Sequence, residues 1–212
     1  MPKGRFMRLL VLLLGLLVLS PLFEEYFKLR LLGDLFFTAI FIYASYSLSR
    51  SKALAAVAVS LALPTIVLFW IKPFYTVQWV EISGGLCGVA FMVIISAAIL
   101  HHIFLEQNIN ADLIAGAIVV YLIMALMWSL LYNVLEAIHP GSFKFPEGTT
   151  QPRGEMSLYF SLVTITTVGY GDITPVTRVA RAFANLEAVV GQLYLVILVS
   201  WLVGMYVSKK SR

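Results

Sequence analysis

The sequence predicts an all-α integral membrane protein with six transmembrane helices. Hydrophobic residues make up 60% of the 212 residues and charged residues 12%, compared with about 45–50% and about 25% in globular proteins. A soluble fold of this composition would have too few polar side chains to cover its surface. The chain also contains six long apolar segments, and a helix of about 20 apolar residues crosses the ~30 Å core of a bilayer.

These segments are residues 6–23, 31–48, 53–71, 82–105, 113–135 and 183–207. The second is the weakest because Asp34 interrupts it, although Arg30 lies one helical turn earlier and could pair with Asp34. The first has the size of a signal peptide. No A-x-A cleavage site follows it, so we expect a retained helix.

Basic residues gather at both ends of the chain, which places both termini in the cytoplasm by the positive-inside rule and predicts a cell-membrane location. The other basic residues are dispersed and form no stripe that would bind nucleic acid. Cys87 is the single cysteine, so no intrachain disulfide can form. The sequence shows no nucleophile–base set, phosphate loop or metal-ligand spacing, and we therefore expect neither an enzyme nor a cofactor.

The longest connection, residues 136–182, separates the fifth and sixth segments. It contains a short apolar stretch, residues 156–165, which could re-enter the membrane as a helix but cannot cross it. Two glycines at alternate positions follow, Gly169 and Gly171. They permit backbone angles that turn successive carbonyls to one side. Such backbone is tolerated at membrane depth where it lines a water-filled path, and inward-facing carbonyls can replace the hydration shell of a cation.

The string TTVGYGD at residues 166–172 resembles the selectivity filter of tetrameric potassium channels, whose hallmark is TVGYG between two helices. The resemblance implies a re-entrant pore helix and selectivity-filter loop between helices five and six. It also implies a pore domain over residues 109–212, which leaves a four-helix membrane domain at residues 1–108. By the same resemblance, K⁺ would be held by backbone carbonyls and one hydroxyl of the filter residues, which are Thr167, Val168, Gly169, Tyr170 and Gly171. Thr166 would support the filter.

Other residues are expected to support the filter. Some bacterial potassium channels pair the filter-end aspartate with a pore-helix glutamate, but that position here is Val163, which makes Tyr159 the candidate donor to Asp172. Glu187 is a carboxylate inside the sixth segment and is therefore a candidate functional residue. It lies near the outer end of that segment, where we expect the structural role of a bond to pore-helix or filter backbone. Gly191 is either a gating hinge, as the resemblance implies, or a helix-packing glycine.

The first four helices carry no voltage sensor. No Lys or Arg occurs from Pro73 to Phe143, and steep voltage gating needs several charges per subunit, each contributing about 2.3 kcal/mol per 100 mV. The fourth segment instead carries Gly84, Gly85 and Gly88, a small-residue face suited to close helix packing.

The resemblance implies a homotetramer that conducts K⁺ passively, with three identical subunits, membrane lipids and K⁺ as partners. A poorly selective cation channel, and an accessory membrane subunit that does not itself conduct, are the alternatives. The sequence leaves the gating stimulus open. His101 and His102 are adjacent and so cannot chelate one metal; they are interfacial side chains or a pH sensor.

Overall fold

The computed structural model describes residues 4–25, 38, 52–71, 78–106, 109–146, 148 and 153–210. The second predicted segment, residues 31–48, lies outside the described residues except for Thr38, as do Arg30 and Asp34.

The described residues form helices at each of the other predicted positions: α1 (Arg5–Glu25), α3 (Lys52–Ile71), α4 (Gln78–Leu105), α5 (Ala111–Ile138), α6 (Arg153–Ile165) and α7 (Arg178–Lys210). The short helix α6 contains the apolar stretch of residues 156–165, which was predicted to be too short to cross the membrane. Two short strands, β1 (Phe143–Lys144) and β2 (Thr174–Pro175), flank α6 and pair antiparallel, with Phe143 opposite Pro175.

Three helices among the described residues are long and apolar enough to cross a membrane: Gln78–Leu105, Ala111–Ile138 and Arg178–Leu202. Helices α1 and α3 contain 21 and 20 residues, close to the length that a span needs. The chain is therefore a predominantly helical, multi-pass membrane protein.

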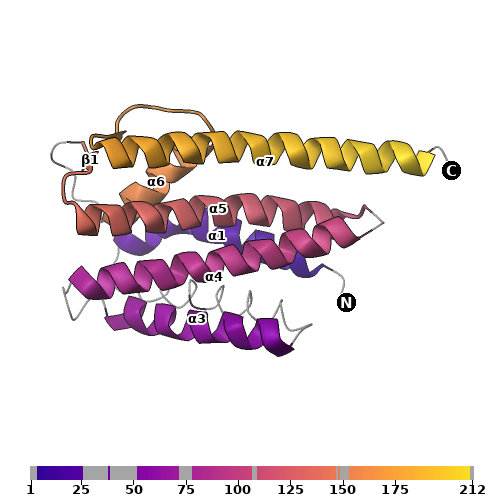
Figure 1. Ribbon diagram of the computed structural model, residues 1–212, viewed down its shortest axis with the longest axis horizontal. Helices are drawn as coiled ribbons and strands as arrows, with labels where there is room; N and C mark the ends of the chain where they lie inside the picture. Colours follow the sequence, from indigo (N-terminus) through magenta and orange to yellow (C-terminus); the bar gives the residue numbers. More distant parts are fainter. Residues whose placement is uncertain are drawn as a thin grey trace.

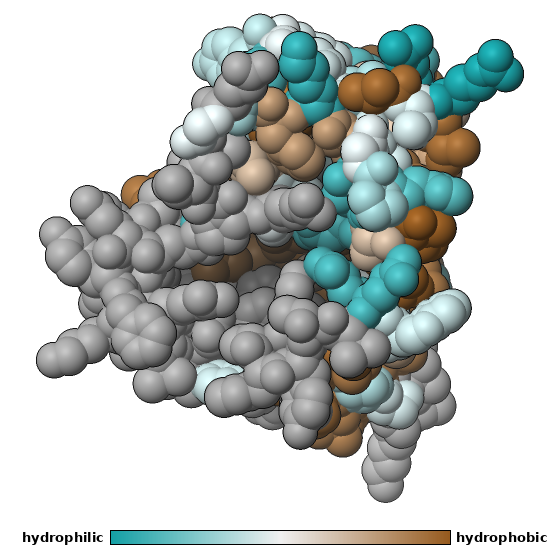
Figure 2. Space-filling model, turned by 90° about the vertical axis from the view of Figure 1, so that its left-hand side faces the viewer, coloured by the Kyte–Doolittle hydropathy of each residue, from teal (hydrophilic) through white to brown (hydrophobic). Residues whose placement is uncertain are grey.

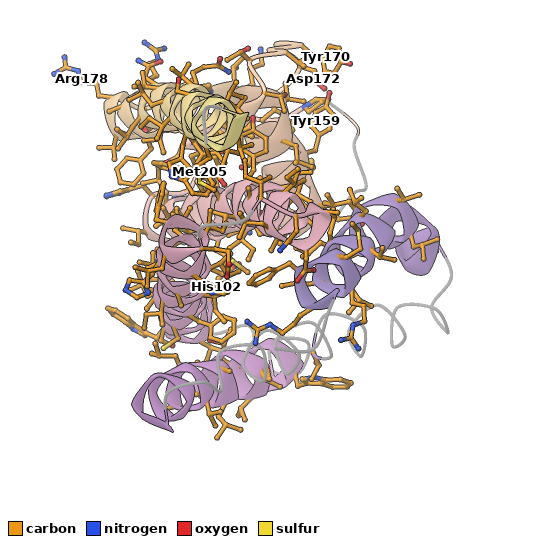
Figure 3. The ribbon with its side chains drawn as sticks, turned by 90° about the vertical axis from the view of Figure 1, so that its right-hand side faces the viewer. His102, Tyr159, Tyr170, Asp172, Arg178 and Met205 are labelled. Carbon is orange, nitrogen blue, oxygen red and sulfur yellow. The ribbon has the colours of Figure 1, made fainter. Side chains whose placement is uncertain are left out.

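Helix α5 is the centre of the arrangement (Figure 1). It packs against α1 and α4 on one side and against α6 and α7 on the other, while α3 packs against α4. Figure 1 shows α6 as a short helix that lies obliquely between the long helices α5 and α7. The chain between α6 and α7 lies on the side of α7 away from α3 (Figures 1 and 3).

The glycines of α4 allow its close approach to α5. A Cβ atom at Gly85 would lie 2.4 Å from Val134 Cγ2, and one at Gly88 would lie 2.8 Å from Leu130 Cδ1. This agrees with the packing face expected for the fourth segment. The bulky groups of α5 occupy the space that side chains on α4 would otherwise fill.

Helix α1 is part of the same apolar core. Phe6, Leu9 and Leu13 are buried, and the Met7 N–H donates a hydrogen bond to Asp112 Oδ1 at 2.9 Å. Because the first N–H groups of a helix have no partner within it, this carboxylate ties the start of α1 to the start of α5.

Helix α7 differs from α4 and α5 because many of its large apolar side chains are exposed. Its exposed large hydrophobic residues extend over five turns: Val179, Leu186, Val189, Leu193, Leu195, Val196, Ile197 and Val199. Residues 166–172, which follow α6, are exposed as well.

Candidate functional site

The segment after α6, residues 166–172, has no regular helix or strand and is exposed along its length. Three alternate residues have positive φ angles: Thr167 at 60°, Gly169 at 59° and Gly171 at 79°. The alternation is the backbone pattern that the two glycines predicted, and it extends one step further toward α6. Left-handed residues at every second position can turn successive carbonyls to one side of the chain, whereas a strand points them to opposite sides.

Thr167 is the unexpected member of this series. A β-branched residue rarely adopts positive φ, and such strain persists only where surrounding contacts enforce it. The end of α6 supplies these contacts: the Thr167 N–H donates to Thr164 O at 2.9 Å, and the Val168 and Gly169 N–H groups both donate to Val163 O, at 3.0 and 3.3 Å. The helix end therefore holds the first half of the segment.

Tyr159 holds the other end of the segment. Its hydroxyl donates to Asp172 Oδ2 at 2.7 Å, the bond expected from the sequence. Its ring stacks on that of Tyr170, with centroids 6.4 Å apart and an interplanar angle of 7°. Figure 3 shows these three side chains together at the edge of the molecule, while Arg178 points away from them. The Ile173 N–H donates to Asp172 Oδ1 at 3.0 Å, so both carboxylate oxygens are bonded.

These bonds favour the ionised aspartate. The hydrogen bond from Tyr159 lowers the pKa of Asp172, and the same bond raises the pKa of Tyr159 to about 12. The segment therefore ends in a negative charge beside solvent. Hydrophilic residues gather on the same end of the molecule, over the part where α7 begins (Figure 2).

The Tyr159→Phe substitution tests this bond through pH. The folded-state pKa of Asp172 is lowered, so its contribution to stability is present above the unfolded pKa and is lost as pH falls through the folded pKa. Without the hydroxyl, the pKa of Asp172 should rise toward its ordinary value, so the variant loses this contribution. It should be less stable than the wild type above the unfolded pKa, and the difference should shrink as pH falls through the folded pKa of the wild type. Thermal unfolding measured across acidic pH checks this. In Asp172→Asn, the same phenylalanine substitution should cause no further change in pH dependence.

Glu187 joins three helices behind the segment. Its side chain in α7 is fully buried, and its two oxygens accept hydrogen bonds from Tyr132 of α5 and Ser161 of α6. The Ser161 hydroxyl also lies 2.8 Å from Ala125 O. The expected structural bond to the short helix is present, but its partner is the Ser161 side chain and not backbone. Both partners are side-chain hydroxyls that the packing of α5 and α6 brings to the carboxylate.

Gly191 lies where α7 passes the end of α6. A Cβ atom there would lie 2.5 Å from Ile165 Cγ1 and 2.8 Å from Ile165 O. Because Ile165 is fully buried, this close approach requires a residue without a side chain. The contact supports the packing alternative, and the hinge stays a prediction.

Glu136 is a structural residue of the site that sequence reasoning missed. It is buried near the end of α5, where its Oε1 accepts the Gly141 N–H at 2.9 Å and its Oε2 accepts the Phe143 N–H at 3.2 Å. The Val176 N–H donates to Ser142 O at 2.8 Å. Glu136 thus fixes the turn that leads into β1. Strand β1 pairs with β2, which begins two residues after Asp172. The sequence could have indicated this role, because Glu136 lies at the end of an apolar run and shortly before the turn residues Pro140 and Gly141.

His102 lies away from the segment. His102 contacts Phe6, with ring centroids 5.7 Å apart, and Figure 3 shows it among the helices below α5. Across the part of the chain that the structure describes, no group of three or more His, Cys, Asp or Glu side chains could hold a metal ion.

Comparison with known families decides the class of protein. The sequence profile of a family described as "Ion channel" matches residues 88–208, more than half of the chain. The chain belongs to this ion-channel family. The match covers the whole of α5, α6 and the segment of residues 166–172, and it begins inside α4. Membership in a family of channels agrees with the expectation that the chain is not an enzyme.

Three curated relatives of this channel are named as potassium channels. Two pore potassium channel c of Oryza sativa subsp. japonica is 39% identical over 88 residues, which are 41% of this chain and 19% of the relative. Potassium channel subfamily K member 17 of Homo sapiens is 41% identical over 65 residues, 30% of this chain and 20% of the relative. Voltage-gated potassium channel Kch of Escherichia coli (strain K12) is 31% identical over 135 residues, 62% of this chain and 28% of the relative.

The channel thus spans less than a third of the length of each of these relatives. No solved structure matches it.

Proposed function

We propose that the chain is a subunit of a potassium-selective channel that conducts K⁺ passively across the cell membrane. The observation that carries this proposal is the alternation of positive φ angles through residues 167–171, directly after a short helix between two long apolar ones. Such backbone can present a column of carbonyl oxygens that replaces the hydration shell of a cation. The names of the three relatives add support for K⁺ as that cation.

In this proposal, the carbonyls of Thr167, Val168, Gly169 and Tyr170 form the ion sites together with the Thr167 hydroxyl. That hydroxyl donates its proton to Thr166 O at 2.7 Å, so its lone pairs stay available to a cation. Gly171 continues the backbone pattern toward Asp172, whose negative charge at the outer end attracts cations from solvent.

The pore is proposed to be a homotetramer. One chain provides one such segment, and a carbonyl cage around an ion needs several, which the potassium channels supply as four around an axis. The exposed apolar face of α7 supports this arrangement, because identical neighbours and lipid would cover it. In the same proposal, the chain has six spans, α6 is a re-entrant pore helix, and both termini are cytoplasmic. Residues 1–108 form a membrane domain beside the pore domain of residues 109–212.

The channel is proposed not to be steeply voltage-gated. Helices α4 and α5 contain no Lys or Arg, so they supply none of the basic gating charges that a membrane potential could move. Instead, α4 packs through glycines against α5. The first helices therefore act as a fixed scaffold on the outer helix of the pore.

Ion flux from liposomes that contain the purified protein tests the function. We expect K⁺ flux that exceeds Na⁺ flux and is blocked by Ba²⁺. We expect Gly169→Ala to abolish that selectivity, because alanine in a left-handed conformation costs about 1–2 kcal/mol at every copy of the filter. Gly148→Ala is the matched control, because Gly148 also has positive φ (73°) with open space around it but lies in the loop before α6.

Each alternative has its own outcome in the same experiment. Equal K⁺ and Na⁺ flux would replace the proposal with a poorly selective cation channel. A protein that is silent and monomeric in detergent would favour the accessory subunit.

A further inference from the structure

The carbonyl groups at the end of α6 connect the proposed filter to the rest of the fold. The last four carbonyls of a helix have no partner within it, and buried ones need a partner from elsewhere. Three of those in α6 accept N–H groups from the residues that follow: Leu162 O from Thr166, Val163 O from Val168 and Gly169, and Thr164 O from Thr167. The hydrogen bonding of α6 thus continues into the backbone of the proposed filter.

The fourth carbonyl, that of Ile165, is bonded from a different helix. The Tyr121 hydroxyl of α5 donates to Ile165 O at 2.9 Å. Ile165 is fully buried and immediately precedes the filter residues. This bond therefore fixes the point at which the filter begins relative to the outer helix.

Tyr121 is itself held in place by α7. Its ring stacks on Tyr194, with centroids 5.9 Å apart and an interplanar angle of 23°. The Tyr194 hydroxyl donates to Ala117 O of α5 at 2.6 Å. The two tyrosines are neighbours, but Tyr121 directs its hydroxyl to the backbone next to the proposed filter, whereas Tyr194 bonds to a carbonyl within α5.

The position of the Ile165 carbonyl matters because the strain lies two residues away. Thr167 has positive φ at the first proposed ion site, and strained backbone relaxes when the contacts that enforce it are lost. A small change in site geometry changes the balance between carbonyl coordination and dehydration, and this balance is what distinguishes K⁺ from Na⁺.

We infer that the Tyr121 hydroxyl is a positioning group that holds the inner end of the filter and thereby sets its preference for K⁺ over Na⁺. The inference rests on the proposed potassium conduction. Tyr121 touches no ion in this scheme. It acts through Ile165 on the carbonyl and hydroxyl oxygens of Thr167.

The test compares Tyr121→Phe with Tyr194→Phe in liposomes under mixed K⁺ and Na⁺ gradients. Both variants remove one hydroxyl from the same stacked pair and keep both rings. We expect the K⁺/Na⁺ permeability ratio to fall roughly tenfold in Tyr121→Phe, a change of the size that one ordinary hydrogen bond produces, and to stay at the wild-type value in Tyr194→Phe. Size-exclusion chromatography in detergent checks assembly.

Three results would overturn the inference. The ratio could be unchanged in Tyr121→Phe, or it could fall equally in both variants, which would assign the effect to the stacked pair. A Tyr121→Phe protein that no longer assembles, beside an intact Tyr194→Phe protein, would make the hydroxyl a requirement for folding. A wild-type protein without K⁺ preference is a separate result, since it contradicts the proposed function before any variant is measured.

Discussion

Replacing Glu187 with alanine is expected to destabilise the fold by about 2–5 kcal/mol. The substitution removes the acceptor from two buried hydroxyls, those of Tyr132 and Ser161, and each buried group without a partner costs about 1–3 kcal/mol. It also leaves a cavity where three helices meet. Unfolding monitored by tryptophan fluorescence in detergent, with the assembled fraction from size-exclusion chromatography, would measure the loss.

Glu187→Gln is the matched control for this prediction. Glutamine keeps the volume, and its amide carbonyl can accept from Tyr132. Its NH₂ group can donate to the Ser161 oxygen once the Ser161 hydroxyl turns to Ala125 O, which already lies 2.8 Å away. We therefore expect Glu187→Gln to lose less than about 1 kcal/mol. A glutamine variant as unstable as the alanine variant would mean that the negative charge is essential, and an unaffected alanine variant would contradict the three-helix junction.

The helices could be predicted from the sequence because lipid imposes a simple constraint. Each span needs about 20 apolar residues with its backbone bonded internally, so apolar runs locate α1, α3, α4, α5 and α7 within a few residues. The backbone of the proposed filter was predictable in part for a related reason. Gly169 and Gly171 permit positive φ, whereas nothing in a threonine signals it, and Thr167 adopts it because the end of α6 binds the N–H groups around it.

The contacts behind the filter could not be predicted, because their partners are distant in sequence. Glu187 meets Ser161 across 26 residues and Tyr132 across 55, and Tyr121 meets Ile165 across 44. No periodicity within one helix encodes these pairs, since they depend on the rotation of α5, α6 and α7 relative to one another. The bond between Tyr159 and Asp172 was predictable because the family pattern supplies Asp172, and the apolar Val163 at the usual partner position left Tyr159 as the candidate donor.

The Gly191→Ala substitution is expected to cost about 1–3 kcal/mol per subunit and to disturb the proposed filter. A methyl group there would meet Ile165 Cγ1 at 2.5 Å and the Ile165 carbonyl oxygen at 2.8 Å. Because Tyr121 also donates a hydrogen bond to the Ile165 carbonyl, this backbone cannot move away freely, so α7 must shift outward or the start of the proposed filter must move. Thermal unfolding and the K⁺/Na⁺ permeability ratio should therefore both change. Gly204→Ala is the control, because nothing lies within 4 Å of a Cβ atom at Gly204.

The Gly191→Ala variant also distinguishes a packing role of Gly191 from a role as a gating hinge. A hinge glycine acts through helix flexibility, so Gly191→Ala would then change open probability and leave selectivity unaltered, and its effect would be independent of Ile165. Packing predicts coupling between the two residues instead. Combining Gly191→Ala with Ile165→Ala removes the Cγ1 contact, so the double variant should lose less stability than the two single losses added together, by about 0.5–3 kcal/mol for residues in contact. Additive losses with unchanged selectivity would assign Gly191 to the hinge, because the end of α6 would then not sense the side chain placed against it.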